Sequence, residues 1–523
     1  MNRPEKGFPL SHDATQFGSS GNAGADMPVQ ARISELDRLV QDGRIDELEQ
    51  ALLADAGHGV GMGVLLPYYE GIIELERGHA ERALALSEMV EESPELSWRR
   101  QLLSGKALHA AGRYREAATQ LQQVGTDSPG WLAAVSVGIK CLLALDDLAG
   151  AASRVDDALV HHPDAPELAY LRGLAARQAG DNRAASIAFM KSIELGGDFR
   201  NPLRALKFSI ARHPDLLDEA IRLVETIRIQ NKGSRLILAA LSVLYQERGD
   251  MEKSAQLNAL FARRRAISKI PALANADWPG RKSASLNFII IGAPKCGTTS
   301  LFGYLARHPQ AICPHTKEIN FFSSKFEFGL EWYLSHFPAI CDSQPFFTGE
   351  ASPGYFAAEG ADDRIRAQLS PVKLILMLRN PADRSISSYY QKRKMGGLNV
   401  GLEDFMKSRI LAKLAGSMDL DYGNGPLAVS TYGPKLKRWM GKFGKEELLV
   451  VNADRFFANT QQEMDRIHAF LGMQPLAGDY PVANMGAYSK DNDAVRAMLI
   501  EHFRPEIPEL DELLGEKTGW DEM

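Results

Sequence analysis

The sequence contains little cysteine and no long apolar run. Its 523 residues include four cysteines, Cys141, Cys296, Cys313 and Cys341, and no two of them have the CxxC spacing of a zinc site. This scarcity excludes a disulfide framework, so we expect a reducing, cytoplasmic compartment. No stretch approaches the roughly 20 apolar residues that a membrane span requires, and we expect no such span.

Positive charge is not in excess either. Lys and Arg number 60 against 66 Asp and Glu, which gives a formal net charge of −6. General nucleic-acid binding requires a basic surface, so we expect no nucleic-acid partner, and any anion site must be local. The composition, with 45% hydrophobic and 24% charged residues, is that of a globular protein, and the length suits two to four domains. Residues 1–28 are rich in Gly, Ser, Pro and Asp without periodicity, which predicts a disordered leader.

Residues 29–269 repeat a turn residue every 34 or 35 positions, and a small or apolar residue follows each turn residue by five positions. The turn markers are Gly43, Gly78, Gly112, Asp146, Gly180, Asp215 and Gly249, and the residues at plus five are Leu48, Ala83, Ala117, Ala151, Ala185, Ala220 and Ser254. Small residues let consecutive helices approach closely. The pattern resembles the tetratricopeptide repeat (TPR), whose period is 34. The resemblance implies an all-α solenoid with a concave face for a protein or peptide partner. An irregular helical bundle is the alternative.

A change of pattern follows the repeats. Residues 270–284 contain two prolines and many small residues, which predicts a linker. Continuous apolar runs at residues 286–292, 373–378 and 448–451 then alternate with helical stretches. Such runs are typical of strands buried on both faces, so residues 285–523 are predicted to form an α/β domain with a parallel sheet.

The first apolar run leads directly into GAPKCGTTSL at residues 292–301. A glycine turn from a strand into a helix presents backbone N–H groups to an anion, and the helix dipole adds to the attraction. The loop is P-loop-like, but Thr298 occupies the position where a nucleotide triphosphatase has its lysine, and Lys295 lies in mid-loop. This arrangement suits a 5'-phosphosulfate better than a triphosphate with magnesium, so an ATP-dependent kinase is the less favoured reading.

Two motifs together resemble the sulfotransferases that use 3'-phosphoadenosine 5'-phosphosulfate (PAPS). PKCGTTSL resembles their 5'-phosphosulfate loop, and LRNPxxRxxSxY at residues 378–389 resembles their 3'-phosphate motif. The resemblance implies release of adenosine 3',5'-bisphosphate and no metal, with Arg384 as a structural or surface residue. The donor-binding residues that it implies are Lys295, Cys296, Gly297, Thr298, Thr299, Ser300, Arg379 and Ser387.

Two further segments resemble the glycan-sulfating, heparan-type branch. Residues 317–322 (KEINFF) are similar to its KExxFF segment, which implies Glu318 as the general base. We expect Phe321 and Phe322 to anchor this loop and to hold the Glu318 carboxylate partly shielded from water, where it would be a better proton acceptor. His315 is a competing candidate base. Residues 349–355 (GEASPGY) resemble a run that tends to line the acceptor side.

The sequence therefore predicts in-line transfer of a sulfuryl group from PAPS to a hydroxyl or amine, with the acceptor a glycan or another macromolecule. Lys295 and Glu318 are the predicted catalytic residues, because one would neutralise charge on the leaving oxygen and the other would take the acceptor proton. We also expect a fragment that begins near Asn275 to retain the donor site. A non-catalytic TPR interaction protein with a degenerate nucleotide-binding domain is the alternative from another class.

Overall fold

The computed structural model describes residues 29–56, 63–276, 278, 286–339, 346–369, 371–394, 400–414, 425–478, 480 and 492–521. The predicted leader at residues 1–28 lies outside the described residues, as do Cys341 and residues 277 and 279–284 of the predicted linker. The chain divides into two compact units, Met1–Pro163 and Asp164–Met523.

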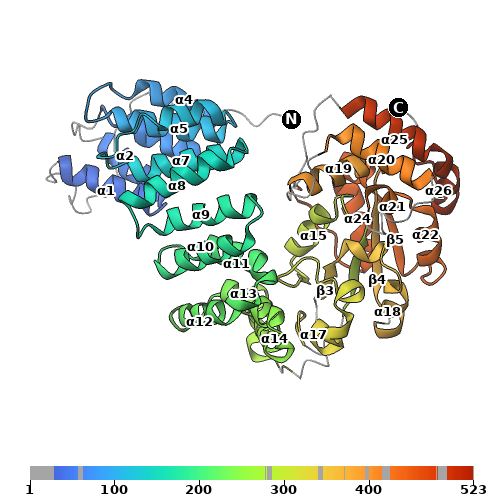
Figure 1. The fold of residues 1–523 in the computed structure, drawn as a ribbon. Helices are drawn as coiled ribbons and strands as arrows, with labels where there is room; N and C mark the ends of the chain where they lie inside the picture. The colour runs from blue at the N-terminus through green and yellow to red at the C-terminus, as the bar shows by residue number, and fades with distance from the viewer. Residues whose placement is uncertain are drawn as a thin grey trace, which may run out of the picture. The chain divides into compact units, whose positions relative to one another are not determined.

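The first unit consists of helices that each pack on the next along the chain (Figure 1). Their bounds are α1 (Val29–Gln41), α2 (Ile45–Ala56), α3 (Leu66–Glu76), α4 (Ala80–Met89), α5 (Ser97–Ala110), α6 (Tyr114–Leu121), α7 (Trp131–Ala144) and α8 (Leu148–His161). Close approach depends on small residues, as predicted. A Cβ atom added at Gly105 would lie 2.4 Å from Cγ of Leu121, so only glycine fits where α5 crosses α6.

The predicted turn markers are confirmed at six of seven positions across the two units. Each of these six residues lies in the turn between two helices and has a positive φ, and they are Gly43, Gly78, Gly112, Asp146, Gly180 and Gly249. The five predicted alanines and both end residues are fully buried: Leu48, Ala83, Ala117, Ala151, Ala185, Ala220 and Ser254. The seventh marker, Asp215, instead lies in the first turn of a helix that begins at Pro214.

The second unit begins with six more helices. These are α9 (Pro166–Gln178), α10 (Asn182–Glu194), α11 (Arg200–Ser209), α12 (Pro214–Gln230), α13 (Arg235–Glu247) and α14 (Met251–Lys269). The same unit contains a sheet of five parallel strands in the order β2-β3-β1-β4-β5. The strands are β1 (Phe288–Gly292), β2 (Ala311–Ile312), β3 (Phe347–Ala351), β4 (Lys373–Leu378) and β5 (Leu448–Asn452). The parallel sheet is confirmed, and its β1, β4 and β5 are the three predicted apolar runs.

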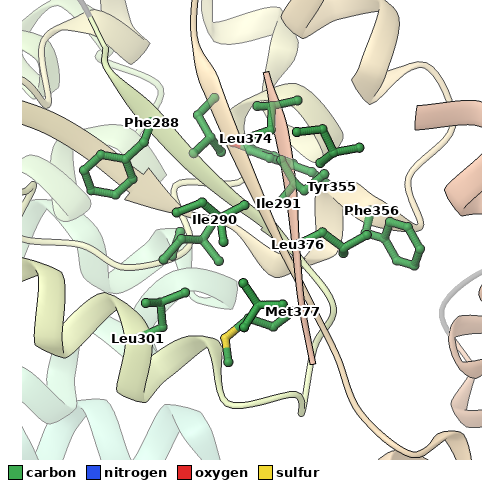
Figure 2. Packing of buried hydrophobic residues seen from close by; sticks show 14 of the residues in the cluster. Phe288, Ile290, Ile291, Leu301, Tyr355, Phe356, Leu374, Leu376 and Met377 are labelled. Atoms are coloured by element: carbon green, nitrogen blue, oxygen red, sulfur yellow. The ribbon is translucent and has the colours of Figure 1, made fainter. Parts of the chain in front are cut away.

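Apolar side chains from both sheet and helices form one core around the central strands. Figure 2 shows Ile290 and Ile291 of β1, Leu376 and Met377 of β4 and Leu301 of α15 within it. The helices of this part are α15 (Thr298–Arg307), α16 (Phe321–Ser324), α17 (Leu330–Leu334), α18 (Ala361–Gln368), α19 (Pro381–Lys394), α20 (Leu402–Leu414), α21 (Pro426–Ser430), α22 (Gly433–Met440), α23 (Ala453–Ala458), α24 (Thr460–Leu471), α25 (Asp493–Phe503) and α26 (Ile507–Leu514).

Helix α14 is bound closely to the sheet-bearing part of its unit. The ammonium of Lys269 donates hydrogen bonds to the backbone oxygens of Ala306 in the last turn of α15, of His308 just after it, and of Ala311 at the start of β2. The indole N–H of Trp332 donates to Oγ of Ser254 at 3.1 Å. The predicted boundary near residue 275 therefore follows the last repeated helix, but it does not coincide with the limit of a compact unit, which lies at Pro163–Asp164.

Candidate active site

The loop between β1 and α15 lies at the switch point of the sheet. Strands β2 and β3 lie on one side of β1, and β4 and β5 lie on the other side. The chain therefore changes direction across the sheet at β1. Ligands of open parallel sheets bind outside the carboxyl ends of such strands. The backbone N–H of Ala293 donates to the Met377 oxygen at 2.8 Å, which keeps the loop beside the end of β4.

The conformation of this loop requires glycine at residue 297. Gly297 precedes the first residue of α15 with φ +88°, and a Cβ atom there would lie 2.7 Å from Cζ of Phe457. Lys295 also has a positive φ, +70°, which orients this residue differently from its neighbours in the loop. The N–H groups of Thr298 and Thr299 open the first turn of α15, where a helix supplies no backbone acceptor of its own, so this end of α15 is suited to an anion.

The other predicted loop residues differ in how accessible their side chains are. Thr299 is exposed, whereas Thr298 and Ser300 are buried. The thiol of Cys296 is fully buried with Sγ 3.8 Å from the Tyr432 hydroxyl, and burial raises its pKa. Cys296 can therefore offer a ligand only its backbone.

Arg384 holds the loop from the interior. Its Nε donates to the Pro294 oxygen at 3.0 Å, and Nη1 donates to the Pro426 oxygen at 2.5 Å and to Oγ of Ser430 at 2.9 Å. The side chain is 2% exposed. The structural role expected for Arg384 is thus the one found, and the hydrogen bond to Pro294 links the second motif to the first.

Several cations surround Lys295. Its pKa is lowered, first by burial and then by the positive charges of Arg384, Lys317 and Arg379, and Glu318 partly opposes this effect. Arg379 follows the last residue of β4 and is half-buried, and its backbone oxygen accepts a hydrogen bond of 2.9 Å from the Tyr432 hydroxyl. Cations that repel one another in a half-buried site favour a bound anion.

Ser387 lies on the second turn of α19 and is 6% exposed. The helix begins two residues after Arg379, so both predicted 3'-phosphate ligands belong to the segment that leaves the carboxyl end of β4. In the part of the chain that the structure describes, no hydrogen bond joins Ser387 to Arg379 or to the loop.

The segment that contains Glu318 is docked against the end of β3. The backbone N–H of Glu318 donates to the Ala351 oxygen at 2.8 Å, and that of Asn320 donates to Oγ of Ser352 at 3.0 Å. Phe321 and Phe322 are almost completely buried, at 1% and 0% exposure, so their predicted anchoring role is confirmed.

The expectation that the Glu318 carboxylate is shielded from water was wrong. The side chain is 53% exposed and forms an ion pair of 2.8 Å with Lys317. The backbone explains this outcome, because Glu318 has φ +67° and the turn directs its side chain outward while Ile319 next to it is buried.

Sequence reasoning did not assign a role to Glu350, which is fully buried on β3. Its Oε1 accepts hydrogen bonds from the hydroxyls of Tyr355 at 2.9 Å and Tyr333 at 3.2 Å, and Oε2 accepts one from Ser352 at 2.6 Å. Burial raises its pKa to about 7 against the opposing effect of these hydrogen bonds. Ser352 also binds Asn320, so Glu350 supports the loop that contains Glu318. The glutamate in GEASPGY, followed by hydroxyl residues two and five positions later, was the available signal.

His315 has both ring nitrogens engaged. Nε2 lies 3.2 Å from Oδ1 of Asn258, an oxygen that only accepts, so we assign the proton to Nε2. Nδ1 then accepts from the Thr316 hydroxyl at 2.6 Å. Burial and the positive charge of nearby groups lower the His315 pKa well below its usual value. These contacts turn the imidazole toward α14, which disfavours it as the base.

Comparisons with known proteins agree with the site. Residues 286–481 match the model of the family described as the sulfotransferase domain. Heparan sulfate glucosamine 3-O-sulfotransferase 6 from Homo sapiens is 32% identical over 209 residues, which are 40% of this chain and 58% of the relative. The human bifunctional heparan sulfate N-deacetylase/N-sulfotransferase 2 is 33% identical over 195 residues, 36% of this chain and 22% of the relative. The chain thus spans less than two thirds of either relative.

A solved structure described as a sulfotransferase from Alicyclobacillus acidocaldarius is 26% identical, covering 45% of this chain and 99% of that chain, with a TM-score of 0.38. The family match and the curated relatives support a sulfotransferase domain in the second half of the chain. Among the described residues, no helix is long and apolar enough to cross a membrane, and no group of three or more His, Cys, Asp or Glu is placed to hold a metal ion.

Proposed function

We propose that the protein is a sulfotransferase that moves a sulfuryl group from PAPS to a hydroxyl or amine of an acceptor. The observation that carries the proposal is the juxtaposition of the glycine loop before α15 with the cations Lys295, Lys317 and Arg379. The match of residues 286–481 to the sulfotransferase domain supports the same reading.

The donor would lie across the carboxyl ends of β1 and β4. Backbone N–H groups of residues 295–300 and the hydroxyls near the start of α15 would bind the 5'-phosphate, and Arg379 with Ser387 would bind the 3'-phosphate. A guanidinium and a hydroxyl suit a phosphate dianion because their hydrogen bonds to it are charge-assisted. The Cys296 side chain would make no contact with the donor, since it is buried.

Transfer would be an in-line displacement at sulfur. The acceptor oxygen or nitrogen forms the new bond to sulfur as the bond to the bridging phosphate oxygen breaks, and adenosine 3',5'-bisphosphate leaves with the electron pair. Lys295 would stabilise the charge that grows on that bridging oxygen. Glu318 would take the proton that the acceptor loses. Its exposure leaves the carboxylate open to an incoming acceptor, beside the Lys317 ammonium with which it forms an ion pair.

The relatives suggest a carbohydrate acceptor, because the names of both include heparan sulfate. We also propose that the repeated helices of residues 29–269 form a TPR-like solenoid whose concave face holds a protein or peptide partner. The regular spacing of their turns and buried small residues supports this proposal.

Transfer of radiolabelled sulfate from PAPS to glycan, lipid, peptide and phenol acceptors in EDTA tests the proposed activity. We expect label in at least one acceptor class, and Lys295→Ala should reduce the rate by about 10²-fold or more, because it removes charge stabilisation from the transition state. The charge-matched control is Lys445→Ala, an exposed lysine outside the site. Absence of transfer to every class, with nucleotide bound, would favour the non-catalytic alternative.

A further inference from the structure

The amide of Asn258 on α14 joins two histidines of the sheet-bearing part of the second unit. Its Oδ1 lies 3.2 Å from Nε2 of His315, and its Nδ2 lies 3.2 Å from Nε2 of His336, which follows α17. Asn258 is 1% exposed, so its side chain lies in the interior. Because Asn258 precedes residues 286–481, the helical part of the chain supplies this amide to the matched domain.

The directions of these hydrogen bonds follow from the backbone around His336. Nδ1 of His336 lies 3.1 Å from the backbone oxygens of both Trp332 and Tyr333, and a carbonyl oxygen only accepts, so Nδ1 carries the proton. Nε2 of His336 is then an acceptor and faces the N–H of the Asn258 amide. This places the amide oxygen toward His315, which agrees with a proton on Nε2 of that ring.

Burial keeps both imidazoles neutral. It lowers the pKa of His336 to about 4 and the pKa of His315 well below its usual value. A protonated His336 would point an N–H at the N–H of Asn258, so the neutral ring is the form that this arrangement accommodates. The hydrogen bonds therefore keep these directions at neutral pH.

Two serines hold the Asn258 side chain in place. The hydroxyl of Ser242, on α13, donates to Oδ1 of Asn258, and it lies 3.3 Å from Oγ of Ser254. Ser254 in turn accepts the indole N–H of Trp332. Ser242 and Ser254 are 3% and 0% exposed. An amide oxygen that accepts from two sides within a buried network has a fixed orientation, so Asn258 fixes the imidazole that donates to it.

The contact with His315 bears on Glu318 through the backbone. His315 precedes Glu318 by three residues, and its ring packs against that of Phe261 on α14, with 4.7 Å between the centroids. Beyond it, the N–H of Glu318 donates to the Ala351 oxygen at 2.8 Å. The segment is therefore held between α14 and β3. Since the Glu318 side chain is 53% exposed, its direction depends on this backbone more than on packing of its own atoms.

We propose that Asn258 is a positioning residue for sulfuryl transfer: it holds His315 so that the backbone leading to Glu318 directs the carboxylate toward the acceptor. The inference rests on the proposed function, in which Glu318 is the general base. Asn258 would not touch the reacting atoms. The last two helices of residues 29–269 thus take part in catalysis, in addition to any contact that the helices make with a partner.

A double-mutant cycle on the full-length protein tests the inference. Asn258→Leu keeps the branched shape of the side chain and removes its hydrogen bonds, and it is made alone and together with Glu318→Gln. The control is Ser254→Ala, one turn earlier on α14, which removes a buried hydrogen bond to Trp332 and leaves His315 unchanged. If Asn258→Leu does not fold, Asn258→Ser replaces it, because a serine hydroxyl is too short to bridge the two imidazoles.

The rate of sulfate transfer from labelled PAPS is measured on whichever of the glycan, lipid, peptide and phenol acceptors the wild-type protein labels. We expect kcat of Asn258→Leu to fall about tenfold or more, because a small displacement of a catalytic group is costly. In the Glu318→Gln background the same change should lower kcat by less than about twofold, since the base to be positioned is gone. Ser254→Ala should keep the wild-type kcat. The calorimetric Kd for adenosine 3',5'-bisphosphate should stay at the wild-type value in both single variants.

Hydrogen–deuterium exchange of the peptide that contains residues 315–320 measures the placement of the segment without relying on activity. Exchange should be faster in Asn258→Leu than in the wild type, because the segment loses its hydrogen bond to α14, and unchanged in Ser254→Ala. Equal exchange in the two variants would overturn the inference. An equal loss of kcat in the wild-type and Glu318→Gln backgrounds would also overturn it, because Asn258 would then act on the fold as a whole.

Failure of the inference and failure of the proposed function give different results. If the wild-type protein labels no acceptor, the proposed function is overturned, and the catalytic role of Asn258 with it. If transfer proceeds and Glu318→Gln is impaired, but Asn258→Leu lowers kcat equally in both backgrounds, only the inference fails. If Glu318→Gln transfers sulfate at the wild-type rate, the base and its positioning residue are both wrong, while the sulfotransferase activity stands.

Discussion

The guanidinium of Arg384 donates a hydrogen bond of 3.0 Å from Nε to the backbone oxygen of Pro294 in the loop before α15. The two residues belong to the two separate sequence motifs of the predicted donor site. Because Arg384 is buried and also binds Pro426 and Ser430, it fixes the loop from the protein interior. The geometry of the anion site thus depends on a residue that need not touch the anion.

Replacement of Arg384 by lysine should loosen the loop. A lysine keeps the charge but cannot reach all three acceptors with a planar fork, so buried acceptors are left unpaired at a cost of about 1–3 kcal/mol. We expect a lower free energy of unfolding in urea and weaker nucleotide binding by calorimetry. Arg393→Lys, at an exposed position on the same helix, is the control. Wild-type values of both quantities in Arg384→Lys would contradict the proposed clamp.

Glu318→Gln should reduce turnover and leave donor binding nearly unchanged. The amide retains the shape of the side chain but cannot accept the proton, and removal of a general base costs roughly 10²–10⁴ in rate. The matched control is Glu327→Gln, an exposed glutamate beyond the anchoring phenylalanines. The rate of sulfate transfer and the calorimetric Kd for adenosine 3',5'-bisphosphate measure the two effects separately. Near wild-type turnover in Glu318→Gln would mean that another group is the base.

Glu350 should make stability depend on pH. Its pKa rises on folding from 4.5 to about 7, so the folded protein holds a proton that the unfolded chain releases within this window. The free energy of unfolding therefore falls as pH rises from about 4.5 to 7. In Glu350→Gln, the decrease in the free energy of unfolding between pH 4.5 and 7 should be smaller by about 1–3 kcal/mol.

Urea unfolding at several pH values, with the exposed Glu359→Gln as control, measures the effect. If the free energy of unfolding changes with pH in the same way in the wild type and in Glu350→Gln, Glu350 is not a source of this pH dependence. The wild-type profile alone is not sufficient, because other groups titrate in the same range.

A fragment that begins at Asp164 should fold and bind nucleotide, since it contains the whole second unit. A fragment from Asn275, which the sequence alone suggests, lacks α14. It loses Lys269, which binds three backbone oxygens, and leaves the buried Trp332 N–H without Ser254. Each unsatisfied buried group costs about 1–3 kcal/mol, so we expect a markedly lower midpoint of thermal unfolding. Equal midpoints for the two fragments would show that α14 is dispensable.

Much of the fold could be predicted because local patterns determine it. Glycines with positive φ between helices, and apolar runs buried on both faces, are visible in single segments of sequence. Strand β3 could not be found in this way, because buried Thr348 and Glu350 interrupt its apolar character and depend on distant partners such as Tyr333. Strand β2 has only two residues, too few for any pattern.

The candidate site residues stay predictions from the sequence, and their surroundings could not be predicted. The motifs indicate Lys295, Arg379 and Glu318, and the cations do gather near the loop. The exposure of Glu318 follows from its positive φ, which is unusual outside glycine and has no signal in the sequence. Contacts such as Asn258 with His336 join residues 78 positions apart, so the role of α14 emerges only from the folded chain.

Calorimetric titration with adenosine 3',5'-bisphosphate and with 5'-AMP in EDTA tests the central claim most directly. We expect the bisphosphate to bind more tightly than 5'-AMP, because charge-assisted contacts to the 3'-phosphate contribute roughly 1.5–3 kcal/mol each before losses. Arg379→Ala should narrow this difference and leave the affinity for 5'-AMP nearly unchanged. Equal affinity of the wild-type protein for the two nucleotides, or binding that requires magnesium, would contradict a PAPS-dependent sulfotransferase.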